Sequence, residues 1–111
     1  MKPNYCKNLK AHIKFREETN FNRHVLLLDN LGSLELTKVE ITIMCHPDIE
    51  IKTIPVIPAK TSVELLSDSK ESRLVFSIIR SDRGNPVAHL VIHFYHPTGF
   101  RDDCVIGVDE R

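Results

Sequence analysis

The feature that most constrains the fold is an alternation of apolar and polar residues, which recurs along the chain between turn residues. An apolar run, Val25–Leu28, is followed by the turn-like segment Asp29-Asn30-Leu31-Gly32. The next segment alternates strictly and places on one face Val39, Ile41, Ile43 and Cys45. A period of two is typical of a half-buried strand. The pattern predicts an all-β protein with Cys45 in its core and with Gly32 free to take a positive φ.

The same pattern predicts a strand in each of eight segments, namely Leu9–Arg16, His24–Asn30, Lys38–Cys45, Ile49–Ile54, Thr61–Leu66, Leu74–Ile79, Val87–Tyr95 and Val105–Val108. Helical periodicity is not convincing anywhere. The segment Ser81–Pro86 carries the strongest turn signal and predicts a hairpin between the strands that flank it. Pro47 is expected to break the third strand, and Pro55 with Pro58 indicates an edge strand or a crossover.

The chain of 111 residues is long enough for one hydrophobic core. We expect an N-terminal extension over residues 1–8, a single domain over residues 9–108 and a tail over residues 109–111. Short strands with regularly spaced turns favour an immunoglobulin-like antiparallel β-sandwich of seven to eight strands. A small closed barrel is the structural alternative.

The middle of the chain resembles two groups of sandwich modules. They are the immunoglobulin-like adhesion-type modules of bacteria and archaea and the ear-type sandwiches of adaptor proteins. The resemblance covers roughly residues 24–96 and is carried by Leu26–Gly32, by Leu36, Val39, Ile41 and Ile43, and by Ile57-Pro58-Ala59-Lys60. It implies a sandwich that binds other proteins or spaces domains, and it carries over no functional residue.

The cysteines, Cys6, Cys45 and Cys104, are odd in number and widely spaced. A disulfide framework in a small secreted chain is usually even and denser, so we expect free thiols in a reducing compartment, the cytoplasm. No apolar run approaches the roughly 20 residues that span a bilayer, and residues 1–6 lack the apolar segment of a signal peptide. We therefore expect no membrane association.

Charge is balanced overall, with 15 basic and 15 acidic residues, but it is not evenly spread. Residues 1–23 carry six Lys or Arg and two Glu, and one face of the first strand would present Lys10, His12, Lys14 and Arg16. This basic stripe is a candidate contact for an acidic protein or for phosphates. A solvated edge is the simpler interpretation. Nucleic-acid binding would also need aromatic platforms, and Phe15 has the phase of a core residue.

The longest predicted strand offers a second candidate surface. One of its faces carries His89, Val91, His93 and Tyr95. Tyrosine and histidine combine an apolar body with a polar tip, and aromatic residues are enriched in protein interfaces. The alternative is that this face is the second buried side of a central strand.

A metal site is the remaining alternative. His46 and His96 each precede a proline, and they could join His93 and Cys104 around one ion if the two His-Pro turns lie at the same end of the sandwich. Cys45 is a further candidate ligand. The sequence shows none of the common nucleophile, phosphate-binding or zinc-protease motifs.

These observations together predict a non-enzymatic protein-interaction or assembly module without a cofactor, with homodimerisation through an edge strand as one route. The interaction candidates are His89, Val91, His93, Tyr95, Lys10, Lys14 and Arg16. A metal- or small-ligand-binding sandwich is the first alternative, and a nucleic-acid binder that uses the basic stripe is the second.

Overall fold

The computed structural model describes residues 5–18, 21–67, 69, 72–81 and 88–110. The elements follow one another as η1 (Tyr5–Asn8), β1 (Leu9–Glu18), β2 (Phe21–Asn30), β3 (Leu36–Ile43), β4 (His46–Ile57), β5 (Thr61–Ser67), α1 (Arg73–Ser81), β6 (Ala88–Tyr95) and β7 (Arg101–Glu110). Seven of the eight predicted strands are present, which confirms the all-β class.

The strands form one mixed sheet in the order β4-β3-β6-β7-β1-β2-β5. All neighbours are antiparallel except β1 and β7, which run parallel where Ala11 pairs with Val108. The expectation of a purely antiparallel sheet is therefore wrong at this position. The parallel pair joins the first and last strands of the chain, and so links β2 and β5 to β3, β4 and β6.

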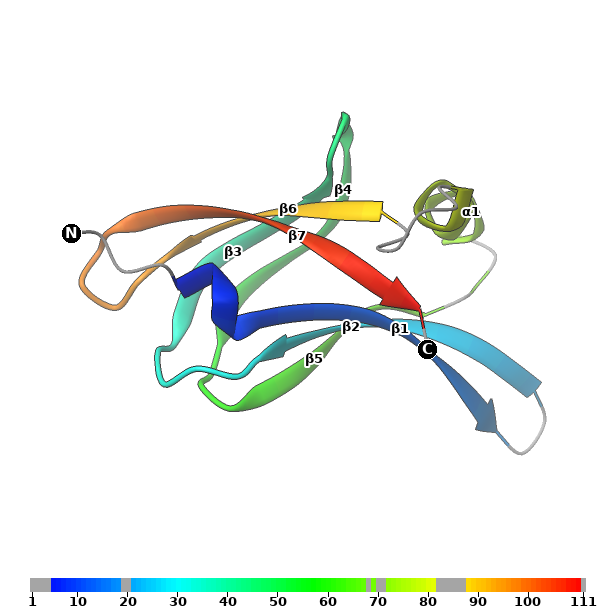
Figure 1. Cartoon of the computed structure of the whole chain (residues 1–111), viewed down its shortest axis with the longest axis horizontal. Coiled ribbons are helices and arrows are strands. Elements are labelled where there is room, and N and C mark those ends of the chain that lie inside the picture. Colours follow the sequence, from blue (N-terminus) through cyan, green and yellow to red (C-terminus); the bar gives the residue numbers. More distant parts are fainter. Residues whose placement is uncertain (1–4, 19–20, 68, 70–71, 82–87, 111) are drawn as a thin grey trace.

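The sheet curls until it is nearly barrel-shaped (Figure 1). Its two edge strands, β4 and β5, thereby come close to each other. Across the gap between them the ammonium group of Lys52 donates a hydrogen bond to the backbone oxygen of Glu64 at 3.1 Å. β4 contains Pro47 and Pro55. Proline lacks the N–H that an inner strand needs, so both residues fit an edge. Pro55 marks an edge strand as predicted, whereas Pro47 lies inside β4 and breaks no strand.

The core lies inside the curl and is built by the inward phase of each strand. β6 shows the alternation most clearly, because Ala88, Leu90, Ile92 and Phe94 are buried while the residues between them are half-buried. β3 contributes Val39, Ile41 and Ile43 in the same way. Phe15 departs from the pattern: it is 47% exposed and lies against His24, with ring centroids 5.3 Å apart. Its predicted core phase is wrong because the β1–β2 hairpin extends past the ends of β5 and β7.

The segment Leu74–Ile79 is helical, so the prediction of a strand there is wrong. α1 buries Phe76 and Ile79, which are three residues apart, and leaves Leu74 70% exposed. This is the spacing of one helix face. The helix lies beside the end of β6 at which Ala88 begins (Figure 1). The hairpin predicted over Ser81–Pro86 falls largely outside the described residues, and a helix rather than a strand precedes it.

The described part of the N-terminal stretch, residues 5–8, is held to the sheet rather than loose. Cys6 forms a disulfide with Cys104 of β7, and the two residues are separated by 98 positions in the sequence. The prediction of free thiols is therefore wrong for these two cysteines. Disulfides persist in oxidising surroundings, so the expectation of a reducing compartment loses its basis.

Tyr5 connects η1 to the loop after β2. Its buried hydroxyl donates to Asn30 Oδ1 at 2.7 Å and accepts from the backbone N–H of Leu34 at 3.0 Å. A Cβ on Gly32 would lie 2.3 Å from that hydroxyl oxygen. Gly32 is therefore required by the close approach of Tyr5, and not by the positive φ that the sequence suggested.

Cys45 lies in the two-residue turn between β3 and β4, where Ile43 pairs with His46. It has a φ of 70° and an exposed, free thiol. The prediction that Cys45 belongs to the core is wrong because β3 ends at Ile43, two residues earlier than the alternation suggested.

Candidate functional site

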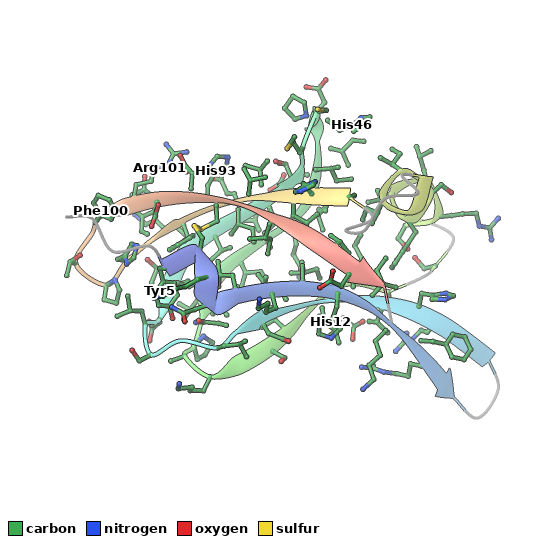
Figure 2. The ribbon with its side chains drawn as sticks, in the orientation of Figure 1. Tyr5, His12, His46, His93, Phe100 and Arg101 are labelled. Carbon is green, nitrogen blue, oxygen red and sulfur yellow. A yellow bond between two sulfur atoms is a disulfide. The ribbon has the colours of Figure 1, made fainter. Side chains whose placement is uncertain are left out.

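The outward-facing residues of three neighbouring strands form an open surface, here called the outer face. β6 supplies the predicted residues His89, Val91, His93 and Tyr95. β3 supplies Lys38, Glu40 and Thr42 on one side, and β7 supplies Arg101, Asp103 and Val105 on the other. This face is not a second buried side of a central strand, because the neighbouring side chains of Val105 and Asp103 are 55% and 58% exposed. Figure 2 shows His93 and Arg101 pointing away from the strands on the same side.

Strand register arranges the outer face in rows across the strands. In the first row Tyr95 lies beside Arg101, and the ammonium of Lys38 is 5.4 Å from the centroid of the Tyr95 ring. A cation at this distance over an aromatic face is attracted to it. Lys38 reaches the ring because it sits at an irregularity between Thr37 and Glu40, with a φ of 48°. This row is cationic.

The second row is acidic. His93 has Glu40 as its partner on β3 and Asp103 as its partner on β7. His93 Nδ1 lies 2.5 Å from Asp103 Oδ1, and the guanidinium of Arg101 lies 3.7 Å from the same carboxylate oxygen. The pair between Arg101 and Asp103 joins two side chains that are more than half exposed. Such pairs contribute about 0–1 kcal/mol, so the contact between Arg101 and Asp103 adds little to the stability of the fold.

The third row is apolar at its centre. Val91 pairs with Val105 on β7 and with Thr42 on β3. His89 follows on β6, next to the turn between β3 and β4, because its backbone oxygen accepts from the N–H of Met44 at 3.0 Å. The outer face therefore runs from a cationic row through an acidic row to an apolar row, on strands that are fixed by hydrogen bonds on both sides.

The basic stripe on β1 is partly neutralised by its neighbours. His12 Nδ1 lies 3.6 Å from Asp29 Oδ2, and the guanidinium of Arg16 lies 3.5 Å from Glu64 Oε2. Lys10 and Lys14 are exposed. The stripe exists as predicted, but two of its four residues, His12 and Arg16, face carboxylates of β2 and β5.

The residues of the predicted metal site do not gather. Met44 contacts the start of β6, so His46 lies at one end of that strand, whereas His96 directly follows its other end. Eight strand residues span roughly 25 Å. Cys104 is bonded to Cys6, His93 faces Asp103, and His96 is buried with its Nε2 3.2 Å from Asp102 Oδ2. Within the described ranges no group of three or more His, Cys, Asp or Glu side chains could hold a metal ion.

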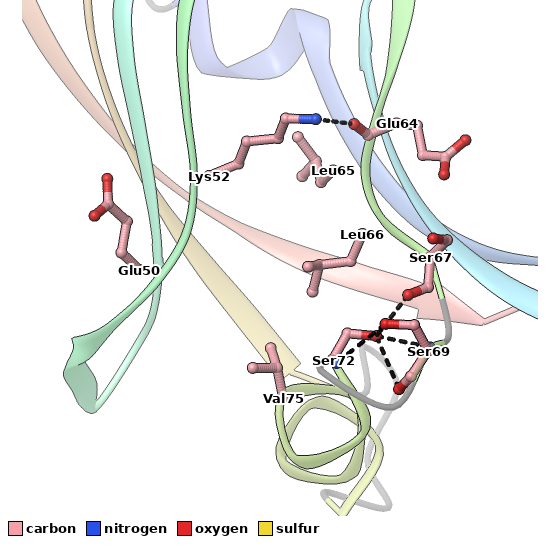
Figure 3. Close-up of a pocket in the computed structure, with 9 residues that line it drawn as sticks. All are labelled: Glu50, Lys52, Glu64, Leu65, Leu66, Ser67, Ser69, Ser72 and Val75. Atoms are coloured by element: carbon pink, nitrogen blue, oxygen red, sulfur yellow. Dashed lines mark hydrogen bonds between the residues drawn. The ribbon is translucent and has the colours of Figure 1, made fainter.

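A cleft of about 440 Å³ opens between the two edge strands and the start of α1 (Figure 3). Lys52 crosses one end of it towards the backbone of Glu64. At the other end Ser72 donates to the backbone oxygen of Ser67 at 2.5 Å and accepts from the N–H of Ser69 at 2.9 Å. These polar groups at the two ends of the cleft bond to protein atoms, and this arrangement does not define a ligand.

A smaller hollow of about 230 Å³ adjoins the turn between β3 and β4. Its lining includes Met44, Cys45, His46 and His89. Cys45 offers an exposed thiol there, but the imidazoles do not form a ligand set around it.

Comparison with protein-family models, with curated proteins and with solved structures finds no match to this chain. In the described part of the chain, no helix has the length and apolar character needed to cross a membrane.

Sequence reasoning identified the β6 part of the outer face and missed its flanks. Period-two alternation already separated Glu40 and Thr42 from the apolar phase of β3. It could not show that Glu40 and Asp103 flank His93, because cross-strand register depends on contacts between distant parts of the chain. Arg101 and Asp103 were missed because β7 was predicted to begin at Val105 instead of Arg101.

Proposed function

We propose that this protein is a non-enzymatic interaction or assembly module that binds another protein through the outer face. The observation that carries the proposal is an uncovered surface on three hydrogen-bonded strands, which presents Tyr95 and Arg101 in one row and the apolar pair Val91 and Val105 two rows away, on the far side of the acidic row. Tyrosine and arginine are enriched among the residues that dominate binding energy. Rigid strands also hold these side chains in place before a partner arrives, which reduces the entropy cost of binding.

The sheet edges are weaker candidates than the outer face. β4 contains Pro47 and Pro55, and Lys52 of β4 already donates to the backbone of β5. Prolines and lysines on edge strands discourage pairing with another chain. We therefore favour the outer face over the edge-strand route to association.

Nucleic-acid binding through the basic stripe is also less well supported. Asp29 and Glu64 lie beside His12 and Arg16, so phosphates would have to compete with built-in carboxylates. Zero formal net charge gives no long-range attraction to a polyanion.

We also propose that the fold is an immunoglobulin-like sandwich. The pairings β2–β5 and β3–β6–β7 correspond to the B–E and C–F–G pairings of an immunoglobulin-like sandwich. We propose that β1 bridges two such sheets by pairing with β2 and β7 at once. The outer face would then be the outer side of the C–F–G sheet.

Site-directed photocrosslinking tests the function. A photoreactive phenylalanine analogue in place of Val105 is compared with the same analogue in place of Lys14, which is exposed on the basic stripe. Both proteins are irradiated in an extract of the source cells, and the adducts are identified by mass spectrometry. Unchanged thermal melting shows that both variants are folded.

We expect discrete protein adducts from position 105 and few from position 14. The adduct is either a second copy of this chain or a different protein, and both results support an interaction surface. Equal labelling from both positions, or no adduct from position 105, contradicts the proposal.

A further inference from the structure

We propose that the partner of the outer face is the outer face of a second copy, so that two chains form a symmetric face-to-face dimer. This inference rests on the proposed function and adds the identity of the partner. It comes from the order of charge on the surface: a cationic row with Lys38, Tyr95 and Arg101 lies directly beside an acidic row with Glu40, His93 and Asp103.

The two rows complement each other under two-fold symmetry. Residues two apart on a strand are roughly 6.6 Å apart, and this is the spacing of the rows. The two-fold axis of the dimer lies in the interface, perpendicular to the strands and midway between the two rows. Rotation about it places the cationic row of one chain over the acidic row of the other. Each strand then lies over the same strand of the second copy. Lys38 then faces Glu40 of the second copy, and Arg101 faces Asp103.

The central pair is matched as well. The same axis places Tyr95 of one chain opposite His93 of the other, so that an aromatic ring meets an imidazole between the two ion pairs. In a two-fold dimer each contact occurs twice. The symmetric arrangement therefore supplies four ion pairs and two ring contacts from only six residue positions.

The local contacts permit this exchange of partners. Arg101 lies 3.7 Å from Asp103 of its own chain, and both side chains are more than half exposed. The Asp103 carboxylate keeps its contact with His93 Nδ1 at 2.5 Å and presents its exposed side to the second copy. A long guanidinium side chain can turn from this pair towards a carboxylate above the sheet with little loss. Twisted sheets pack face to face at about 30°, and the long side chains of Lys38 and Arg101 can accommodate this angle.

A charge-reversal experiment in trans tests the dimer. One variant, K38E with R101E, makes both rows acidic, and the other, E40K with D103K, makes both rows basic. Sedimentation velocity is measured for each variant alone, for their equimolar mixture and for the wild type, at about 0.05 M and about 0.5 M salt. Thermal melting confirms that each variant is folded.

We expect the wild type to dimerise at low salt, with a dissociation constant that rises at high salt because exposed charges are screened. Each variant alone should dimerise at least about tenfold more weakly, since like charges then face each other. The equimolar mixture should recover the dimer, because an acidic face meets a basic face.

A matched control separates a specific face from general attraction. The variant K10E with K14E changes net charge by the same amount as K38E with R101E, but on the basic stripe. It should not associate with E40K/D103K. Equal association would overturn the inference, as would a mixture that remains monomeric.

A wild type that stays monomeric up to a concentration on the order of 1 mM would also overturn it. That result leaves the proposed function standing if position 105 still crosslinks to a different protein. If position 105 yields no adduct at all, the proposed function fails too.

Discussion

Asn30 shows how one side chain can organise a loop that the sequence marks only as a turn. It is fully buried, and its amide nitrogen donates to the backbone oxygens of Leu34 at 2.8 Å and Pro58 at 3.1 Å. Its Oδ1 accepts from the hydroxyl of Tyr5 at 2.7 Å. Three segments distant in sequence therefore meet at one amide.

Replacing this amide should be costly. Asn30→Ala removes the donor to the partly buried carbonyls of Leu34 and Pro58 and the acceptor of the buried Tyr5 hydroxyl. Loss of the partner of a buried polar group costs roughly 1–3 kcal/mol. We expect urea denaturation to show the free energy of unfolding reduced by at least about 2 kcal/mol. Leu31→Ala is the control, since Leu31 is 50% exposed. Similar values for the two variants would argue against the role of Asn30.

Gly32 gives a second prediction at the residue scale. Gly32→Ala brings a Cβ within 2.3 Å of the Tyr5 hydroxyl oxygen, so the ring must shift away from Asn30. We expect a loss of roughly 1–3 kcal/mol in the free energy of unfolding, as for other overpacked sites. Full stability in Gly32→Ala would show that Tyr5 does not need this close approach.

At the scale of elements, α1 shows where the apolar pattern alone could not distinguish a strand from a helix. Leu74, Phe76 and Ile78 satisfy a period of two, while Phe76 and Ile79 satisfy a helical spacing. A short apolar run permits both interpretations, and tertiary contacts decide between them. β1 was predicted correctly because Leu9, Ala11 and Ile13 alternate with charged or polar residues over a longer stretch.

The helical assignment has a sharp test. Phe76→Ala removes a buried aromatic ring, so we expect a loss of roughly 3–5 kcal/mol in the free energy of unfolding. Leu74→Ala should change it by no more than about 0.5 kcal/mol, because Leu74 is 70% exposed. A strand would bury both residues on the same face, so equal losses would contradict α1.

The disulfide between η1 and β7 gives the second prediction at this scale. It closes a loop across nearly the whole chain and restricts the unfolded state. In a Cys45→Ser background, a reducing agent acts on the disulfide alone, and we expect reduction to remove roughly 2–5 kcal/mol of stability. Chemical denaturation with and without reductant measures this. Identical curves would mean that η1 contributes little to the fold.

At the scale of the whole molecule, the sequence could predict strands but not their neighbours. The parallel pairing of β1 with β7 places the first and last strands of the chain side by side, and no local pattern encodes it. The outer face likewise depends on which strands are neighbours. Alternation identified His89, Val91, His93 and Tyr95, whereas the charged rows appear only once β3 and β7 are placed in register beside β6.

The metal hypothesis failed at this scale for a related reason. Two His-Pro dipeptides resemble each other in sequence, but β6 separates them by its whole length. Cys104 looked like a free candidate ligand because Cys6, which lies 98 positions away in the sequence, gave no local sign of being its disulfide partner.

Self-association through the outer face is tested by an amide NMR titration of the wild-type protein against its own concentration at low salt. We predict that chemical shifts change mainly over residues 37–42, 91–95 and 101–105, which form the outer face. Changes centred on residues 10–16 or 61–67 would contradict the account, because the interface would then be the basic stripe or an edge strand. An unchanged spectrum would contradict self-association altogether.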